Sequence, residues 1–211
     1  NNSEVSGDNI AGIAARAWDA AYLMGALAGL MTESDQIGGI AGFDMPNIVA
    51  QMEAYKMGAR DVNPDVETTV IYIGTFEDVA NGKEAALAQA SAGVDVIFHI
   101  ADAAGVGVIQ ACEESGIWAM GWGADQNHLA PETVLTSLLT NGDQLLMKDV
   151  QLVIDGEWTG GVRLYGLDTG VADIADFHGL VPEDVASQIV DLRQQIVDGE
   201  LEIPYMPEAT D

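Results

Sequence analysis

The 211-residue sequence predicts an α/β fold in which a parallel sheet carries helices on both faces. The first observation is alternation: four short apolar runs between residues 36 and 123 are separated by segments with helical character. The second is punctuation, since Pro46 stands at the start of one helical segment and Gly93 and Gly116 at the ends of two others. Strands that alternate with helices in this way form βαβ units, whose sheets are parallel and covered on both sides.

The first elements can be placed in order along the chain. Residues 1–9 resemble a loose lead-in, and a helix is expected over residues 10–31, where the small-residue run ALAGLM should pack closely against a neighbour. Strands and helices then alternate as strand 36–43, helix 46–62, strand 66–74, helix 81–93, strand 94–101, helix 104–116 and strand 117–123. The strands are short apolar runs, and the helices are long enough to cross back over a parallel sheet.

The pattern changes after Asp125. The remaining elements are expected as a strand-like run at 132–139, a helix from 141 that ends near Gly156, a strand that runs into an extended loop over 162–176, and a helix over 181–201. The last helix has Pro182 in its first turn with acidic residues beside it. Its apolar residues recur at helical spacing and require only a core explanation.

Composition excludes two classes of partner. The formal net charge is −27, from 7 Lys and Arg against 34 Asp and Glu, so nucleic acid and anionic membrane surfaces should be repelled. The longest apolar stretch, near residues 20–31, is too short to cross a bilayer, so no direct membrane insertion is expected. The acidic, lysine-poor composition indicates a halophilic or marine source. The single cysteine, Cys112, excludes an internal disulfide and is expected to be a buried small hydrophobe.

Function should be found in the loops that follow the strands at 66–74, 94–101 and 117–123, because small molecules bind along that edge of an open parallel sheet. In the first loop, Phe76 could stack on a heteroaromatic ring, which is worth ~1–3 kcal/mol for bases on proteins, or could instead cover the next helix. Asp78 is expected to cap that helix.

The second and third loops offer further candidates. Asp102 could accept a hydrogen bond from a base N–H or a ribose hydroxyl, or could cap the following helix. His99 could contact the ligand, although a packed strand residue is the more common role. Trp122 could stack against the ligand. No Lys or Arg lies near the second loop, which argues against a phosphorylated ligand.

The sequence shows no set of residues typical of catalysis or of a cofactor. The three histidines, His99, His128 and His178, are scattered over separate loops and strands. No metal-ligand spacing, Ser-His-Asp set or phosphate-binding P-loop can be identified. We therefore expect no metal, no cofactor and no chemistry.

Five segments, taken in order, resemble one known family. They are 22–31 (YLMGALAGLM), 44–66 (DMPNIVAQMEAYKMGARDVNPDV), 74–98 (GTFEDVANGKEAALAQASAGVDVIF), 129–137 (LAPETVLTS) and 166–182 (GLDTGVADIADFHGLVP). The series is similar to the basic-membrane-protein family of ABC-transporter substrate-binding proteins and covers nearly the whole chain. The resemblance implies a periplasmic-binding-protein type I fold, in which two α/β lobes close around a ligand.

The resemblance also divides the chain. It implies a lead-in and a packing helix near the hinge in residues 1–33, the second α/β lobe in 34–138, and a C-terminal return into the first lobe in 139–211. Members of the family begin with strands and helices that build most of the first lobe. This sequence starts after them, so we expect it to be a fragment.

The resemblance suggests ligand contacts residue by residue. In the family, the residue that matches Phe76 faces the ligand. His99 and Asp102 resemble a branch thought to favour purine-like ligands. These likenesses imply a purine-type ligand.

Two positions depart from the nucleoside-binding members. Those members carry an Asp that holds ribose hydroxyls where this chain has Gly123, and a Lys where it has Thr140. Asp125 and Gln126 keep the second half of the same motif, and Trp122 replaces a small or tyrosyl residue. The departures favour a less hydroxylated or differently held molecule.

We therefore expect a solute-binding protein of an ABC importer that captures a small heteroaromatic molecule, a purine-type nucleobase or nucleoside, between two lobes. Its partners would be this ligand and the transporter permease, and its location would be extracytoplasmic, in the periplasm or as a cell-surface lipoprotein. One alternative is the ligand-sensing domain of a signalling or regulatory protein. The other is a purine-nucleoside-processing enzyme, since Asp78, His99, Asp102 and Asp125 share one sheet edge.

Overall fold

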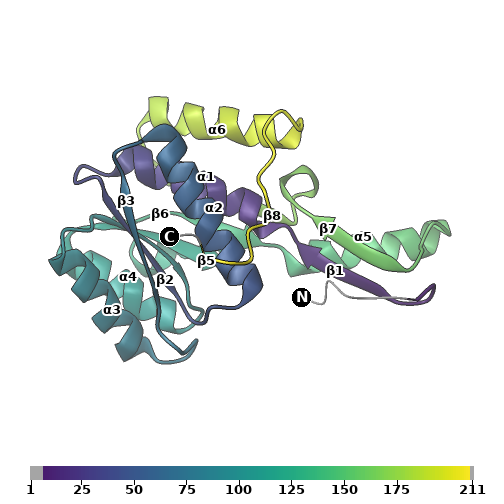
Figure 1. Ribbon diagram of the computed structural model, residues 1–211, viewed down its shortest axis with the longest axis horizontal. Helices are drawn as coiled ribbons and strands as arrows, with labels where there is room; N and C mark the ends of the chain where they lie inside the picture. Colours follow the sequence, from purple (N-terminus) through teal and green to yellow (C-terminus); the bar gives the residue numbers. More distant parts are fainter. Residues whose placement is uncertain (1–6, 210–211) are drawn as a thin grey trace.

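The computed structural model, which describes residues 7–209, contains a six-stranded sheet and a separate two-stranded sheet (Figure 1). The strands of the main sheet are β2 (Gln36–Ala41), β3 (Glu67–Tyr72), β4 (Val96–Ile100), β5 (Trp118–Gly123), β6 (Val134–Thr140) and β8 (Ala172–Ile174), in the spatial order β3-β2-β4-β5-β6-β8. The small sheet pairs β1 (Ala11–Ala15) with β7 (Gly161–Tyr165). The helices are α1 (Ala17–Met31), α2 (Pro46–Val62), α3 (Val79–Ser91), α4 (Ala104–Ser115), α5 (Gly142–Asp155) and α6 (Glu183–Val197).

The main sheet is parallel from β3 to β6, as the alternation of strands and helices predicts. Only β8, at the edge, runs antiparallel to its neighbour β6. The sequence predicts one strand that continues into a loop over 162–176, but the chain breaks there into β7, a short 3₁₀ helix (Leu167–Thr169) and β8. Gly170, with φ of 71°, allows the left-handed turn that reverses the chain into β8.

Helices cover both faces of the main sheet, which confirms the predicted fold class. On one face, residues of α1, α2 and α6 share a core with β2, β4 and β6. On the other face, α3 and α4 contribute Ala86, Val108, Ile109 and Cys112 to a second core. Cys112 is fully buried, as expected for a small hydrophobe, and burial raises its pKa to about 12.

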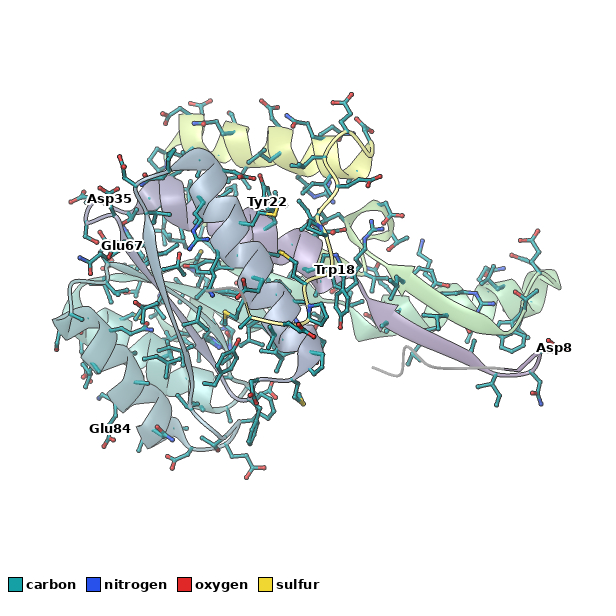
Figure 2. The ribbon with its side chains drawn as sticks, viewed as in Figure 1. Asp8, Trp18, Tyr22, Asp35, Glu67 and Glu84 are labelled. Atoms are coloured by element: carbon teal, nitrogen blue, oxygen red, sulfur yellow. The ribbon has the colours of Figure 1, made fainter. Side chains whose placement is uncertain are left out.

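Helix α1 is the centre of the larger core, and Figure 2 shows Trp18 and Tyr22 on it. It is buried on nearly all sides, which explains why its sequence is apolar without a polar face. A Cβ at Gly25 would lie 1.9 Å from the carbonyl oxygen of Tyr55 in α2. A Cβ at Gly58 would lie 2.0 Å from the carbonyl oxygen of Tyr22. The two helices therefore approach to backbone contact, as the run ALAGLM predicts.

The prediction of one helix over residues 10–31 is wrong at its start. Residues 11–15 form β1, which pairs in parallel with β7, and the helix begins only after Arg16. No Gly or Pro stands between β1 and α1, and apolar residues continue on both sides of Arg16, so periodicity gives no boundary there. A partner strand about 150 residues further along the chain decides the outcome.

Strands β1 and β7 and helix α5 form an arm that projects from the main body (Figure 1). Inside the arm, Asp149 of α5 accepts hydrogen bonds from Trp158 Nε1 at 2.9 Å and from the Arg163 guanidinium at 3.2 Å. The outer side of α5 is apolar and exposed: Leu146, Met147 and Val153 are each 61% exposed and Ile154 is 70% exposed.

The surface of the main body is acidic, with side chains such as Asp35, Glu67 and Glu84 on its periphery (Figure 2). Five of the seven Lys and Arg residues take part in ion pairs with Asp or Glu. Between residues 7 and 209, no helix combines the length and apolar character that crossing a membrane requires.

Candidate functional site

The candidate site lies at the carboxyl ends of the parallel strands. The chain runs from β2 outward to β3 and then back past β2 to β4, so the strand order reverses between β2 and β4. Ligands of open parallel sheets bind in the crevice outside such a reversal. The loops that the sequence singles out, after β3, β4 and β5, all open onto this edge.

A cavity of about 280 Å³ lies between the arm and this edge of the sheet. Its apolar wall includes Ile13 of β1, Leu145 of α5 and Val171. Its polar wall consists of Asn47 and Gln51 from α2 with Thr140 and Asn141 at the end of β6, and the indole of Trp122 closes one side. The cavity therefore touches both the arm and the main body.

Trp122 is fixed at two points. Its indole Nε1 donates to Gln51 Oε1 at 2.9 Å, and its backbone N–H donates to Gln126 Oε1 at 3.0 Å. Gln51 is only 3% exposed, and its Nε2 donates to the carbonyl oxygen of Asn47 at 3.0 Å. The ring that lines the cavity is thus held by α2 and by its own loop.

His99 is hydrogen-bonded to Gln126 in the loop that follows β5. It is fully buried in β4, and its Nε2 lies 2.9 Å from Gln126 Oε1. Since Gln126 Oε1 already accepts from Trp122, His99 must donate through Nε2–H, which leaves Nδ1 unprotonated and without a partner among residues 7–209. Burial lowers the pKa of His99 to about 4, although the bond to Gln126 opposes the shift. The structure therefore places His99 beneath the loop as a neutral, packed residue.

Phe76 lies over Gly42, where a Cβ would meet its ring at 2.2 Å. Its ring packs edge-on against Phe43, with centroids 5.1 Å apart. Phe43 follows β2 and is 41% exposed, so two aromatic rings stand beside the strand-order reversal. Sequence analysis missed Phe43 because it was taken as the end of the strand. The signal that identified Phe76, an aromatic residue after a predicted strand, also applies to Phe43.

The structure shows which of Asp78 and Asp102 caps the helix that follows it. Asp78 caps α3, since its carboxylate accepts from the Asn81 backbone N–H at 3.1 Å, and this prediction is confirmed. Asp102 does not cap α4, whose N-cap is Ala103. Within the described residues the exposed Asp102 carboxylate has no hydrogen-bond partner, and its φ of 46° is uncommon for a residue other than glycine. The capping alternative for Asp102 is therefore wrong.

The remaining candidates lie beside the cavity. Gly123 has φ of 89°, and its carbonyl oxygen accepts from Thr140 Oγ1 at 3.4 Å. The two positions that depart from nucleoside-binding proteins are therefore neighbours. Asp125 is outside the cavity lining, and its Oδ2 lies 3.0 Å from His178 Nε2. The residues predicted to bind the ligand are Phe76, His99, Asp102, Trp122, Gly123 and Asp125. Of these six, Trp122 alone lines the cavity.

The arrangement offers stacking surfaces and neutral hydrogen-bonding groups. His99, the histidine of the predicted catalytic alternative, is bonded to an amide and not to a carboxylate. In the described part of the chain, no three His, Cys, Asp or Glu side chains are placed to hold a metal ion.

The sequence is similar to a known protein family and to several of its members. Residues 1–206 match the model of a family described as ABC transporter substrate-binding protein, PnrA-like. The chain is 31% identical to basic membrane protein A of Borreliella afzelii, over 95% of this chain and 63% of that protein. It is 29% identical to a purine-binding protein of Brucella abortus, over 92% of this chain and 55% of that protein. The chain thus spans only about six-tenths of the length of these curated relatives.

Solved structures share the fold. A transcriptional activator of the comK gene from Bacillus halodurans superposes with a TM-score of 0.86 at 28% identity, covering 95% of this chain and 69% of that chain. A solute-binding protein of an ABC transporter system from Aeropyrum pernix gives a TM-score of 0.79 at 24% identity, covering 93% and 67%. These structures confirm the predicted periplasmic-binding-protein type of fold.

Proposed function

The chain belongs to the PnrA-like family of ABC-transporter substrate-binding proteins, and we propose that it binds a small heteroaromatic solute of the purine type for an ABC importer. The family was predicted from five sequence segments, and the match over residues 1–206 confirms it. The ligand and the role of the whole protein are parts of the proposal.

The observation that carries the proposal is the cavity between the arm and the sheet. A solute in it would contact Ile13 and Leu145 from the arm and Trp122 and Asn47 from the main body. A ligand that touches two parts of a protein stabilises the arrangement in which both contacts form. Binding proteins of two lobes use this effect to close around their solute.

Three aromatic rings favour a flat ligand. Trp122 lines the cavity, and Phe76 and Phe43 stand further along the same sheet edge. Stacking on such rings is worth about 1–3 kcal/mol per base. We expect Asp102 to contribute a carboxylate, because it is exposed and has no hydrogen-bond partner within the described residues. The relative named as purine-binding, at 29% identity, supports a purine-type ligand.

The arm supports part of a further proposal, that the chain returns into a first lobe after residue 138. Helix α5 and strand β7 of this segment lie in the arm, whereas β8 and α6 belong to the main body. Leu146, Met147, Val153 and Ile154 expose an apolar helix face on α5, beside a sheet of only two strands. Such a face requires a covering layer. We propose that it packs against polypeptide corresponding to the part of the longer relatives that this chain does not match.

In this proposal the partner is the permease of the importer, and the protein works outside the cytoplasm, in the periplasm or as a cell-surface lipoprotein. The ligand enters as an unmodified solute and leaves unchanged. No group of the site is required to transfer a proton or an electron pair.

A second candidate function is ligand sensing in a regulatory protein. It is favoured by the likeness to the transcriptional activator of comK, whose chain superposes with a TM-score of 0.86. A DNA-binding or membrane-spanning segment in any longer form of the protein would favour sensing, and a signal peptide with a lipidated cysteine would favour transport.

The decisive experiment is mass spectrometry of the small molecule released when the purified native protein is denatured. A purine base or nucleoside is the expected result, and the presence of the sugar would show whether ribose is held without the charged residues of nucleoside-binding proteins. Release of a different heteroaromatic molecule would move the ligand away from purines. Detection of turnover of adenosine to base and sugar would contradict a binding protein.

A further inference from the structure

We propose that Asn47 of α2 recognises an uncharged, hydrogen-bonding edge of the ligand, and that Gln51, one turn later, fixes Trp122 as the wall against which the ligand lies. This inference rests on the proposed function of the cavity as the ligand site. It concerns the chemical class of the ligand and two residues that the sequence analysis did not single out.

The cavity lining offers no positive charge to an anionic ligand. None of the seven Lys and Arg residues lines the cavity, and five of them are held in ion pairs elsewhere. An anion in the cavity would have no counter-charge, in a chain of net charge −27. Removing a charge from water without a partner costs several kcal/mol. Phosphorylated and carboxylate ligands are therefore disfavoured.

The described lining of the cavity also offers no negative charge to a cationic ligand. Between residues 7 and 209, no Asp or Glu side chain lines the cavity. Asp102 and Asp125 lie on the same sheet edge but outside the lining, and Asp125 is directed toward His178. An ammonium or guanidinium group inside the cavity would lack a direct partner. The cavity therefore suits a neutral group.

The polar side chains that line the cavity can form hydrogen bonds with a neutral group of a ligand. Among the described residues the side-chain amide of Asn47 has no hydrogen-bond partner, so it offers both a donor and an acceptor. Asn141 uses its Nδ2 on the Gly170 carbonyl oxygen at 2.7 Å, which leaves its Oδ1 as an acceptor. Thr140 adds a hydroxyl. This set matches an edge with adjacent donors and acceptors, found on a nucleobase or among the hydroxyls of a sugar.

Gln51 acts on the site through Trp122, to which it is hydrogen-bonded. Its Oε1 accepts from Trp122 Nε1 and its Nε2 donates to the Asn47 carbonyl oxygen, so both ends of the amide are occupied. At 3% exposure it cannot offer much surface to a ligand. Its bond links α2 to the loop after β5 and holds the indole plane against the cavity. Gln51 is therefore a positioning residue.

The first test compares four probes by titration calorimetry at one salt concentration: adenine, adenosine, adenosine monophosphate and glucose. We expect one or more of the neutral probes to bind and adenosine monophosphate to bind at least about a hundredfold more weakly than the best of them. Best binding by adenine or adenosine identifies a nucleobase edge, and best binding by glucose identifies sugar hydroxyls. Preference for the monophosphate would overturn the neutral-edge inference but keep the binding function. No binding by any probe, with no molecule released on denaturation, would overturn both.

The second test is Asn47→Asp, measured with the tightest neutral probe. The change is isosteric and removes only the amide donor while adding a negative charge. Asn47 lies in the first turn of α2, where an acidic side chain stabilises a helix by about 0.3–1 kcal/mol, so the melting temperature should not fall. We expect affinity to fall at least about tenfold.

The matched control is Gln144→Glu, which places the same extra charge in the first turn of α5 outside the cavity lining. It should leave affinity unchanged. Equal affinity of the Asn47→Asp variant and the wild type would refute the role of Asn47, and an equal loss in both variants would show a long-range charge effect instead.

The third test is a double-mutant cycle between Gln51→Met and Trp122→Phe. If Gln51 acts by holding the indole N–H, each single change should weaken binding, and the double variant should bind no more weakly than Trp122→Phe alone. Additive losses would mean that Gln51 acts independently of Trp122. A melting temperature measured for each variant separates loss of the fold from loss of binding.

Discussion

Acid should destabilise this protein through His99, and one substitution should reveal how much. His99 is fully buried and neutral, and its Nδ1 has no partner in the described residues. Protonation would place a charge and an unpaired donor in the core. The perturbation is His99→Gln, because a glutamine can still donate to Gln126 but does not become charged.

The magnitude follows from the two pKa values of the histidine. Burial lowers the folded-state pKa of His99 to about 4, from the ordinary value of 6.5. Between these values the unfolded chain binds more protons than the folded chain, so the free energy of unfolding falls as pH falls. Each pKa unit corresponds to about 1.4 kcal/mol, so the full loss is about 3 kcal/mol and roughly 2 kcal/mol of it is reached by pH 5. At pH 7 the loss is absent.

The assay is denaturant unfolding of the wild type and of His99→Gln at about pH 7 and about pH 5, in the same salt. The wild type should lose about 2 kcal/mol more than the variant between the two conditions. His128→Gln is the control, since His128 is exposed and its side chain makes no hydrogen bond within the described residues. Equal pH dependence in the wild type and in His99→Gln would refute the reasoning.

Three further predictions concern packing. Gly25→Ala should lower the free energy of unfolding by about 3 kcal/mol or more, because its Cβ would press on a backbone oxygen, whereas Gly142→Ala, with open space around it, should be neutral or mildly stabilising; thermal melts would compare them. Cys112 should react with a thiol reagent only after unfolding, because burial raises its pKa to about 12, and reaction at pH 8 in the native protein would contradict this. Ile154→Asp should change the free energy of unfolding of this chain by less than about 0.5 kcal/mol, yet should be destabilising in any longer form of the protein in which the outer face of α5 is covered.

The main sheet could be predicted because its signals are local. Each strand of β2 to β5 is a separate apolar run, and glycines such as Gly116 end the helices between them. Strand β1 could not be predicted, because only Arg16 separates its apolar residues from those of α1, with no Gly or Pro between them. Its strand conformation depends on pairing with β7, which lies about 150 residues away in the sequence. Local periodicity carries no information on such a partner.

The candidate site shows the same division. Trp122, which lines the cavity, could be identified because it lies at the carboxyl end of a predicted strand. Phe76 was identified by a similar signal, and its contact with the ligand stays a prediction. Asn47 and Gln51 were missed, since they read as ordinary residues of a helix. They belong to the cavity only because α2 begins beside the loop after β5, and the hydrogen bond between Gln51 and Trp122 spans 71 residues. Residues of this kind are recognised only when the packing of helices on the sheet is known.

The connections between the arm and the main body explain why the cavity should respond to a ligand. The chain passes between the two parts at Arg16, at Asn141 and at Gly166. These crossings are bonded to one another, since the Arg16 backbone N–H donates to the Tyr165 carbonyl oxygen at 2.8 Å and the Asn141 backbone N–H donates to the Val171 carbonyl oxygen at 2.8 Å. Asn141 and Val171 also line the cavity. In the proposed closure the arm would turn about these segments, so a solute bound there would contact them and would stabilise the position of the arm that it prefers.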